Sequence, residues 1–139
     1  MNKDDIKKRI EYIEERRKTL KKAIGEYEKL NGFEKYKCLK TIERDSEEII
    51  ESAVRINQDI LEEKETIAET YRESFEKVSD ILKIDENTKE KLANSTGFRN
   101  RLAHDYMYLN EKATMKSAKI ILTLYPVYLL KIIKYIENN

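Results

Sequence analysis

The chain has 139 residues, enough for one domain with a sizeable core, and carries 28 Lys and Arg against 27 Asp and Glu. A net charge of +1 excludes attraction to nucleic acid by the chain as a whole, so any such contact must come from local patches. Cys38 is the only cysteine, which excludes an internal disulfide and a Cys/His metal set. We therefore expect a single domain spanning residues 1–139 in an intracellular setting.

Membrane insertion is not expected. The longest apolar run, residues 120–130, is interrupted by Thr123 and Pro126 and is shorter than the roughly 20 residues that a membrane span needs. The first residues do not resemble a signal peptide. These features predict a cytoplasmic protein.

The first predicted helix covers about 25 residues, because its apolar side chains recur three and four positions apart. Asn2 or Asp4 can cap its start, and Asn31-Gly32 can end it by tolerating a positive φ. Arg17 interrupts the stripe. The spacing also fits a coiled-coil seam, so this helix packs either within a bundle or against a second subunit. The stripe consists of Ile6, Ile10, Ile13, Leu20, Ile24, Tyr27 and Leu30.

The second predicted helix runs from about Glu34 to Glu63, antiparallel to the first, with a polar run at residues 43–48 in the middle of its apolar face. Polar side chains at such a place cost stability unless they are paired. The run is either a solvated charged face, or Arg44, Glu47 or Glu51 packs behind the His104 segment described below and orients it. The apolar face consists of Tyr36, Leu39, Ile42, Ile49, Ala53, Ile56 and Ile60.

The third helix is predicted over residues 65–84, and the fourth over residues 88–108 or 88–109. Asp85 or Asn87 can cap the fourth helix. Gly97 falls inside it, where it marks a local bend or allows another backbone to come close.

A fifth helix begins at Glu111, and Pro126 is expected to kink or interrupt it because proline removes a backbone donor. The sequence shows no strand pattern. The predicted fold class is therefore all-α, an up-and-down bundle of about five helices. The apolar surface of the fifth helix consists of Met115, Ala118, Ile121, Leu122, Tyr125, Leu129, Ile132, Ile133 and Ile136.

Residues 97–106, Gly-Phe-Arg-Asn-Arg-Leu-Ala-His-Asp-Tyr, bring together side chains suited to chemistry. His104 is the only histidine, and an imidazole with an unperturbed pKa of about 6.5 exchanges protons near neutrality. The planar guanidinium of Arg99 suits phosphate oxygens. The segment is a candidate site for acid–base chemistry on a phosphate ester.

Helix geometry restricts how this site can be built. On one ideal helix Asn100 and His104 share a face, whereas Arg99 lies about 140° away from His104. Three solutions remain: an irregular backbone near Gly97, an Arg99 side chain that sweeps across, or a second copy of the motif related by a twofold axis. We favour the twofold arrangement, which predicts a homodimer.

The pattern Phe98-Arg99-Asn100-x-Leu102-x-His104-x-Tyr106 resembles the signature of HEPN-domain ribonucleases, and in particular of their HepT toxin branch. The resemblance implies a small all-helical dimer with its two motifs facing each other across a cleft. It also implies a partner, a minimal nucleotidyltransferase antitoxin that attaches AMP to Tyr106.

The expected activity is metal-independent cleavage of RNA, with no cofactor. Arg99 and His104 are the expected catalytic residues, and Asn100 is the expected orienting residue. Arg101, Lys112 and Lys116 are expected RNA contacts, although exposed lysines on a helix are equally often a solvated face. Asp105, next to His104, is a departure that would raise the pKa of the imidazole if the two side chains met.

Two other classes of function remain open. A single histidine on an amphipathic helix is often structural, so the chain could be a non-catalytic helical adaptor that binds nucleotide or a nucleotidyltransferase. A metal-dependent enzyme using carboxylates of the second helix is the third class, and it would need added divalent ions.

Overall fold

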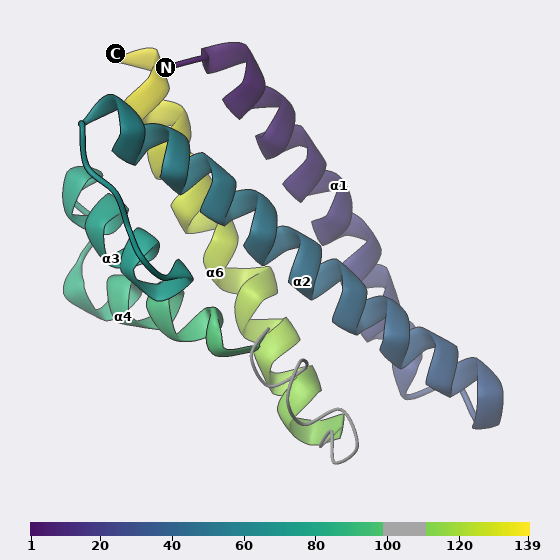
Figure 1. Ribbon diagram of the computed structural model, residues 1–139. Coiled ribbons are helices and arrows are strands. Elements are labelled where there is room, and N and C mark those ends of the chain that lie inside the picture. The colour runs from purple at the N-terminus through teal and green to yellow at the C-terminus, as the bar shows by residue number, and fades with distance from the viewer. Residues whose placement is uncertain (99–110) are drawn as a thin grey trace.

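The computed structural model describes residues 1–98 and 111–139, and every regular element among them is an α-helix (Figure 1). The all-α bundle predicted from the sequence is confirmed for these residues. The long helices α1, α2 and α6 lie side by side, and the short helices α3 and α4 form a hairpin against α2 and α6 (Figure 1). The helices are α1 (Lys3–Tyr27), α2 (Gly32–Glu63), α3 (Tyr71–Ile81), α4 (Glu86–Ser95) and α6 (Glu111–Glu137).

Helix α1 begins as its sequence predicts, because the Asn2 side chain accepts a hydrogen bond from the Asp5 amide at 3.1 Å. It ends at Tyr27, earlier than expected. Gly32 has a φ of +56°, so the Asn31-Gly32 pair shapes the start of α2 rather than the end of α1. The two helices run antiparallel, as predicted (Figure 1). Most of the predicted stripe is buried, namely Ile6, Ile10, Ile13, Leu20 and Tyr27.

Arg17 interrupts the α1 stripe because it reaches α6. Its Nη1 pairs with Glu14 at 2.8 Å, and its Nη2 donates to the Leu122 carbonyl at 3.3 Å. Leu122 lies four residues before Pro126, so this carbonyl has no helical N–H donor. Helix α6 continues through Pro126, so of the two expected effects of this proline, a kink or an interruption, the interruption is wrong. The guanidinium supplies the donor that proline removes, and α1 packs within the chain rather than in a separate seam.

We expect Arg17→Met to lower the free energy of unfolding by about 1 kcal/mol, the net worth of one hydrogen bond. In a Pro126→Ala background the loss should be smaller, because the backbone amide that the alanine introduces can bond to the Leu122 carbonyl. Urea denaturation of the four proteins in this double-mutant cycle measures the coupling. Glu14→Gln is the control for the ion pair, and equal losses in both backgrounds would refute the Arg17–Pro126 relationship.

The polar run of α2 is only partly a solvated face. Glu43, Asp45 and Ser46 are buried, which contradicts that interpretation for these residues, whereas Arg44 is exposed. The Asp45 side chain is 2% exposed and accepts a hydrogen bond from Thr19 Oγ1 at 2.7 Å. Desolvation raises the pKa of Asp45 above its ordinary value, and Thr19 and Arg16 partly counteract it.

The raised pKa of Asp45 predicts how its replacement changes stability with pH. The ionised carboxylate costs the fold free energy above its folded-state pKa, and this cost disappears when the group is protonated in both states. Asp45→Asn, which keeps an acceptor for Thr19, should therefore unfold at a higher temperature than the wild type at neutral pH. The advantage should shrink as the pH falls through the raised folded-state pKa, and it should be gone below about 4. Thermal unfolding followed by circular dichroism across this range tests the sign of the stability change. A loss of stability in Asp45→Asn that is confined to neutral pH would show that the attraction of Arg16 for the carboxylate outweighs its desolvation.

Tyr36 was predicted on the buried face of α2, but its side chain is 55% exposed. The other predicted core positions of this helix, Leu39, Ile42, Ile49, Ala53, Ile56 and Ile60, are buried. The apolar stripe therefore extends one turn beyond the surface that α1 and α6 cover.

Helix α3 is shorter than predicted, because the chain leaves α2 through Glu65, whose φ is +57°. Thr70 then caps α3 by accepting a hydrogen bond from the Glu73 amide at 3.0 Å. The pattern Thr70-x-x-Glu73 is a start signal that the prediction from the sequence overlooked. Asp85 caps α4 as expected, accepting from the Thr88 amide at 3.0 Å.

The core beside the α3–α4 hairpin is aromatic. Phe75 of α3 packs edge-to-face on Tyr125 and Tyr128 of α6, with ring centroids 6.0 Å and 5.5 Å away. The buried Tyr128 hydroxyl donates to the Asn57 side-chain oxygen, and Asn57 donates to Ser74 Oγ at 3.2 Å. These contacts join α2, α3 and α6 and fix the position of α6.

Candidate active site

The predicted catalytic and modification residues lie outside the residues that the structure describes. This applies to Arg99, Asn100, Arg101, His104 and Tyr106. The described structure instead defines the two ends that bracket this segment, Phe98 on one side and Glu111 on the other.

The approach to the segment differs from the continuous fourth helix predicted from the sequence. Helix α4 ends at Ser95, Thr96 forms a turn, and Gly97 and Phe98 are again helical. The Ser95 and Thr96 hydroxyls donate to the carbonyls three residues earlier, at 2.6 Å and 2.7 Å. Such side-chain bonds compete with the helical pattern and end the helix. No described atom lies within 4 Å of a Cβ built on Gly97, which favours the bend over a close backbone approach.

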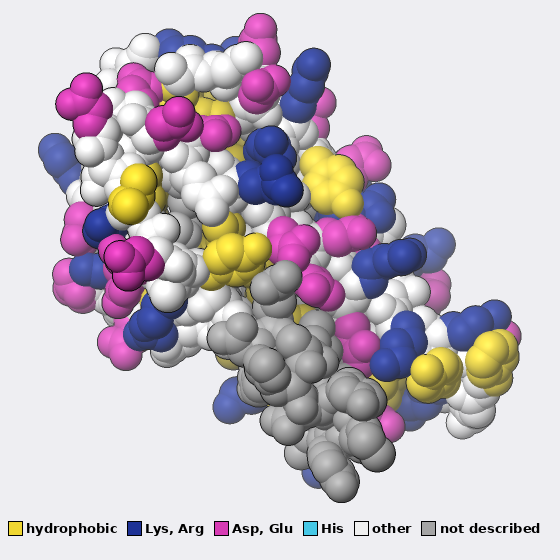
Figure 2. Space-filling view, in the orientation of Figure 1, with side chains coloured by type: hydrophobic (Ala, Val, Ile, Leu, Met, Phe, Trp, Pro, Cys, Tyr) yellow, Lys and Arg dark blue, Asp and Glu magenta, His cyan; other side chains and the backbone are white. Residues whose placement is uncertain are grey.

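Mixed charges cover the surface around the bundle. Figure 2 shows Lys and Arg side chains interspersed with Asp and Glu over most of the visible face, in agreement with the near-zero net charge. Lys112 and Lys116, the predicted RNA contacts of α6, are both exposed and lie one turn apart. Any attraction for an RNA backbone must therefore be local.

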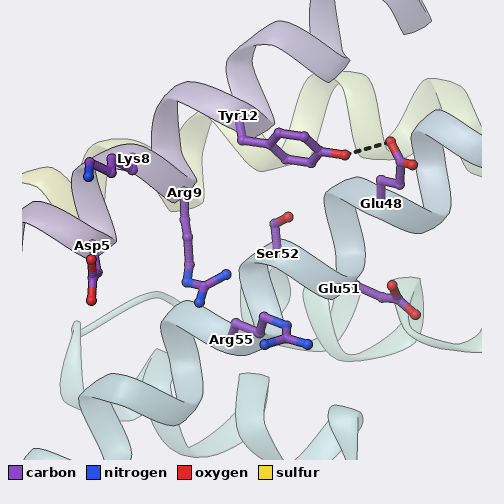
Figure 3. A pocket seen from close by; sticks show the side chains of 8 residues that line it. All are labelled: Asp5, Lys8, Arg9, Tyr12, Glu48, Glu51, Ser52 and Arg55. Atoms are coloured by element: carbon purple, nitrogen blue, oxygen red, sulfur yellow. Dashed lines mark hydrogen bonds between the residues drawn. The ribbon is translucent and has the colours of Figure 1, made fainter.

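A shallow groove of about 610 Å³ lies between α1 and α2 (Figure 3). Arg9 and Arg55 line it together with Glu48 and Glu51, and the Tyr12 hydroxyl donates to Glu48 at 2.8 Å. Charges of both signs line the groove, so it does not select an anion or a cation. Glu51, like Arg44 and Glu47, was predicted to pack behind His104. His104 lies outside the described residues, so this prediction stays untested.

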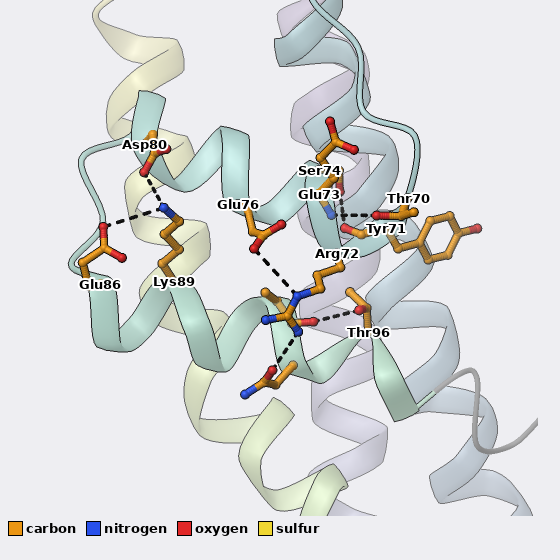
Figure 4. Close-up of polar contacts among 12 residues, drawn as sticks. Thr70, Tyr71, Arg72, Glu73, Ser74, Glu76, Asp80, Glu86, Lys89 and Thr96 are labelled. Atoms are coloured by element: carbon orange, nitrogen blue, oxygen red, sulfur yellow. Dashed lines mark hydrogen bonds and ion pairs between the residues drawn. The ribbon is translucent and has the colours of Figure 1, made fainter.

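Polar contacts hold the α3–α4 hairpin together (Figure 4). Lys89 Nζ lies 2.9 Å from the Asp80 carboxylate, and Arg72 Nη1 donates to the Asn94 side-chain oxygen at 2.8 Å. The second contact ties α3 to the last turn of α4, shortly before the segment that carries the motif. The hairpin therefore positions the chain where it leaves α4.

A contact with α6 and the burial of an aromatic ring hold this end of the segment. The Ser95 hydroxyl lies 2.8 Å from the Tyr125 hydroxyl, and the Phe98 side chain is 2% exposed. Burial of an aromatic ring one residue before Arg99 anchors the start of the segment.

The other end of the segment is attached to α1. The Tyr27 hydroxyl donates to the carboxylate of Glu111, the first residue of α6, at 2.5 Å. Burial, followed by this hydrogen bond, raises the pKa of Tyr27 to about 12, so the phenol stays protonated as a donor. Both ends of the segment are therefore held by the bundle.

A groove of about 930 Å³ opens between α4 and α6, and Phe98, at the start of the segment, lines it. Its walls combine apolar side chains with lysines, among them Lys91, Phe98, Lys116, Ile120 and Val127. A groove of this composition and size accommodates a flat apolar group next to an anionic one.

The described residues offer no metal site. Among residues 1–98 and 111–139, no three His, Cys, Asp or Glu side chains come together in a group that could hold a metal ion. Cys38 is half-buried and donates to the Ala23 carbonyl at 3.2 Å, and burial raises the pKa of its thiol, which makes it less reactive. No described helix combines the length and apolar character of a membrane span.

Together, the helical bundle and the Arg-Asn-x3-His pattern define a HEPN-type domain. The family described as Ribonuclease HepT-like matches residues 5–132, which include the whole of the segment 99–110. The chain belongs to this family of HepT-like ribonucleases, and the resemblance read from the motif is confirmed. No curated protein matches the sequence.

Proposed function

We propose that the chain is a metal-independent endoribonuclease toxin of the cytoplasm, paired with a minimal nucleotidyltransferase antitoxin. One observation carries this proposal: the HepT-like ribonuclease match spans the segment that holds Arg99, Asn100, His104 and Tyr106. The only histidine of the chain falls within the family's motif, so the acid–base residue and the family assignment agree.

The proposed reaction is internal transesterification. Neutral His104 removes the proton from a ribose 2′-hydroxyl, whose oxygen attacks the adjacent phosphorus, while Arg99 neutralises the charge that builds on the phosphate oxygens. The bond from phosphorus to the 5′-oxygen breaks, and a protonated imidazole donates to that oxygen. The products are a 2′,3′-cyclic phosphate and a free 5′-hydroxyl.

A homodimer supplies both protonation states from one residue type. One His104 acts as the base and the His104 of a second copy acts as the acid, which requires the two motifs to meet at a twofold axis. Asn100, one helical turn before His104, orients the imidazole. Light scattering of the purified protein should give twice the mass of one chain, and a strict monomer would contradict this arrangement.

The described residues on either side of the segment 99–110 are consistent with RNA binding there. Both ends of the segment are held by the bundle, through Phe98 and Glu111, and a groove of about 930 Å³ runs beside Phe98. Lys112 and Lys116 on α6 and Arg101 supply cations for backbone phosphates.

Regulation is proposed at Tyr106, two residues after His104. Transfer of AMP to its hydroxyl by the antitoxin would add a negative charge and a bulky nucleotide beside the catalytic residues. The added phosphate would repel the RNA backbone, and the nucleotide would fill the cleft.

The activity is tested by incubating the purified chain with RNA in excess EDTA and determining the chemistry of the fragment ends. We expect cleavage to persist in the chelator and to leave 2′,3′-cyclic phosphates. Cleavage that requires added divalent ions would favour a metal-dependent enzyme instead. Inactivity under all conditions would favour the non-catalytic adaptor.

A further inference from the structure

Two aromatic side chains are exposed side by side at the start of α2. Phe33 is 70% exposed and Tyr36 is 55% exposed, and their rings are nearly parallel, with centroids 6.3 Å apart and an interplanar angle of 16°. They are three residues apart, so they project from the same side of the helix. Large apolar side chains of this kind are usually buried, and an exposed stacked pair indicates a binding surface.

A lysine from the next helical turn lies over each ring. Lys37 Nζ lies 5.1 Å from the centroid of Phe33, and Lys40 Nζ lies 5.4 Å from that of Tyr36. We call these four residues the aromatic platform. Figure 2 shows hydrophobic and basic side chains together at the corner where α1 turns into α2. Flat rings combined with cations are the features that bind the bases and phosphates of single-stranded nucleic acid.

The local charge favours an anionic partner. Residues 29–40 contain four lysines and one glutamate, in a chain whose net charge is only +1. Lys37 pairs with Glu34 at 3.1 Å and Lys40 with Glu43 at 3.2 Å. The Lys37–Glu34 pair is exposed on both sides and contributes about 0–1 kcal/mol, so a phosphate can replace Glu34 without a large loss of stability.

A second groove lies next to the turn between α1 and α2, and none of the four platform residues lines it. This groove, of about 720 Å³, runs between the α1–α2 corner and α6, and Tyr27 and Lys35 line one side. Glu111, Lys112 and Lys116 line the other side, and Glu111 directly follows the segment 99–110. The groove is lined by four lysines, Lys35, Lys112, Lys116 and Lys119, against Glu28 and Glu111, and this excess of positive charge favours an anionic strand.

We infer that the aromatic platform binds unpaired bases of the RNA substrate, away from the bond that is cleaved. The inference rests on the proposed ribonuclease function and adds a substrate class to it: single-stranded RNA long enough to reach from the cleavage site to α2. One or two bases stack on Phe33 and Tyr36, and Lys37 and Lys40 contact the adjoining phosphates.

The test measures binding of a fluorescein-labelled oligouridylate by anisotropy, in a His104→Ala background that prevents cleavage. Phe33→Ala combined with Tyr36→Ala should weaken binding by about 5-fold to 100-fold, the usual effect of removing a stacked base. Tyr36→Phe keeps a ring and should bind almost normally. Ile67→Ala removes another exposed apolar side chain, 74% exposed in the connection after α2, and is the matched control.

An abasic strand with the same number of phosphates separates stacking from charge. The parent protein should bind it less tightly than oligouridylate, and the double alanine variant should bind both about equally. Lys37→Gln with Lys40→Gln should lower the salt dependence of binding, by a slope of about 0.7 for each phosphate that is no longer neutralised. Unchanged binding in the double alanine variant overturns the inference. A change in oligomeric mass on removal of the rings, with RNA binding intact, would assign the surface to protein contacts and also overturn it.

Cleavage of short and long substrates, with His104 intact, keeps this inference distinct from the proposed function. If the platform lies away from the cleaved bond, as inferred, a dinucleotide does not occupy both places. The double alanine variant should therefore cleave a dinucleotide at the wild-type rate while cleaving long single strands more slowly. If the wild type cleaves neither substrate, the ribonuclease proposal fails, and the binding measurements still report on the platform. If the variant cleaves both normally, the platform inference fails and the ribonuclease proposal stands.

Discussion

Replacement of His104 by Ala should lower the rate of RNA cleavage in EDTA by about 100-fold to 10,000-fold for each proton transfer that it supports. Arg99→Ala should cost about 100-fold to 1,000-fold, because the charge on the phosphate oxygens would develop without a nearby cation. Rates measured with saturating RNA place both losses in the chemical step. RNA affinity should fall more for Arg99→Ala than for His104→Ala.

The matched control is Arg101→Ala, two residues from Arg99 and proposed only as a backbone contact. It should weaken binding with little effect on the rate at saturation. Comparable losses for Arg99→Ala and Arg101→Ala would indicate that both arginines merely attract RNA, and wild-type activity in His104→Ala would refute the mechanism. Circular dichroism of each variant separates a catalytic defect from misfolding.

The pH profile provides an independent check. If one imidazole acts as the base and its twofold counterpart as the acid, the cleavage rate should pass through a maximum near an imidazole pKa of about 6.5 and fall on both sides. A rate that only rises with pH would indicate that a single imidazole acts as the base and that no histidine protonates the leaving oxygen.

The second large effect is expected at Tyr106. When the chain is produced together with a nucleotidyltransferase antitoxin, mass spectrometry should find AMP on Tyr106, and cells should survive. Tyr106→Phe removes the acceptor oxygen but keeps the ring. It should therefore remain unmodified and toxic in the presence of the antitoxin.

Tyr108→Phe is the control for this experiment, since it removes a neighbouring phenol without touching the proposed acceptor. It should be modified and neutralised like the wild type. Modification mapped to Tyr108, or survival of cells that produce Tyr106→Phe with the antitoxin, would contradict the assignment of Tyr106. Loss of cleavage by Tyr106→Phe in vitro would indicate a catalytic role for the phenol instead.

Some features of this protein could be predicted because they depend on neighbouring residues alone. Apolar side chains three and four positions apart predicted α1, α2 and α6, since a helix with one apolar face gains free energy wherever that face is covered. The caps by Asn2 and Asp85 are equally local. The family was also readable, because its motif is a short run of residues from Phe98 to Tyr106.

Other features depended on which segments meet in three dimensions. Pairing of Arg17 with the Leu122 carbonyl joins positions far apart in the chain, and neither the arginine nor Pro126 alone reveals it. Asp45 and Tyr36 both lie on α2. Helix α1 covers the polar carboxylate and leaves the apolar ring exposed, which is the reverse of what the hydropathy of the two residues predicts. Burial is decided by the partner surface that covers a position. The sequence by itself determined the long helices α1, α2 and α6 and the family's motif. The tertiary structure decided which polar groups are paired inside the bundle and which aromatic rings remain available to a ligand.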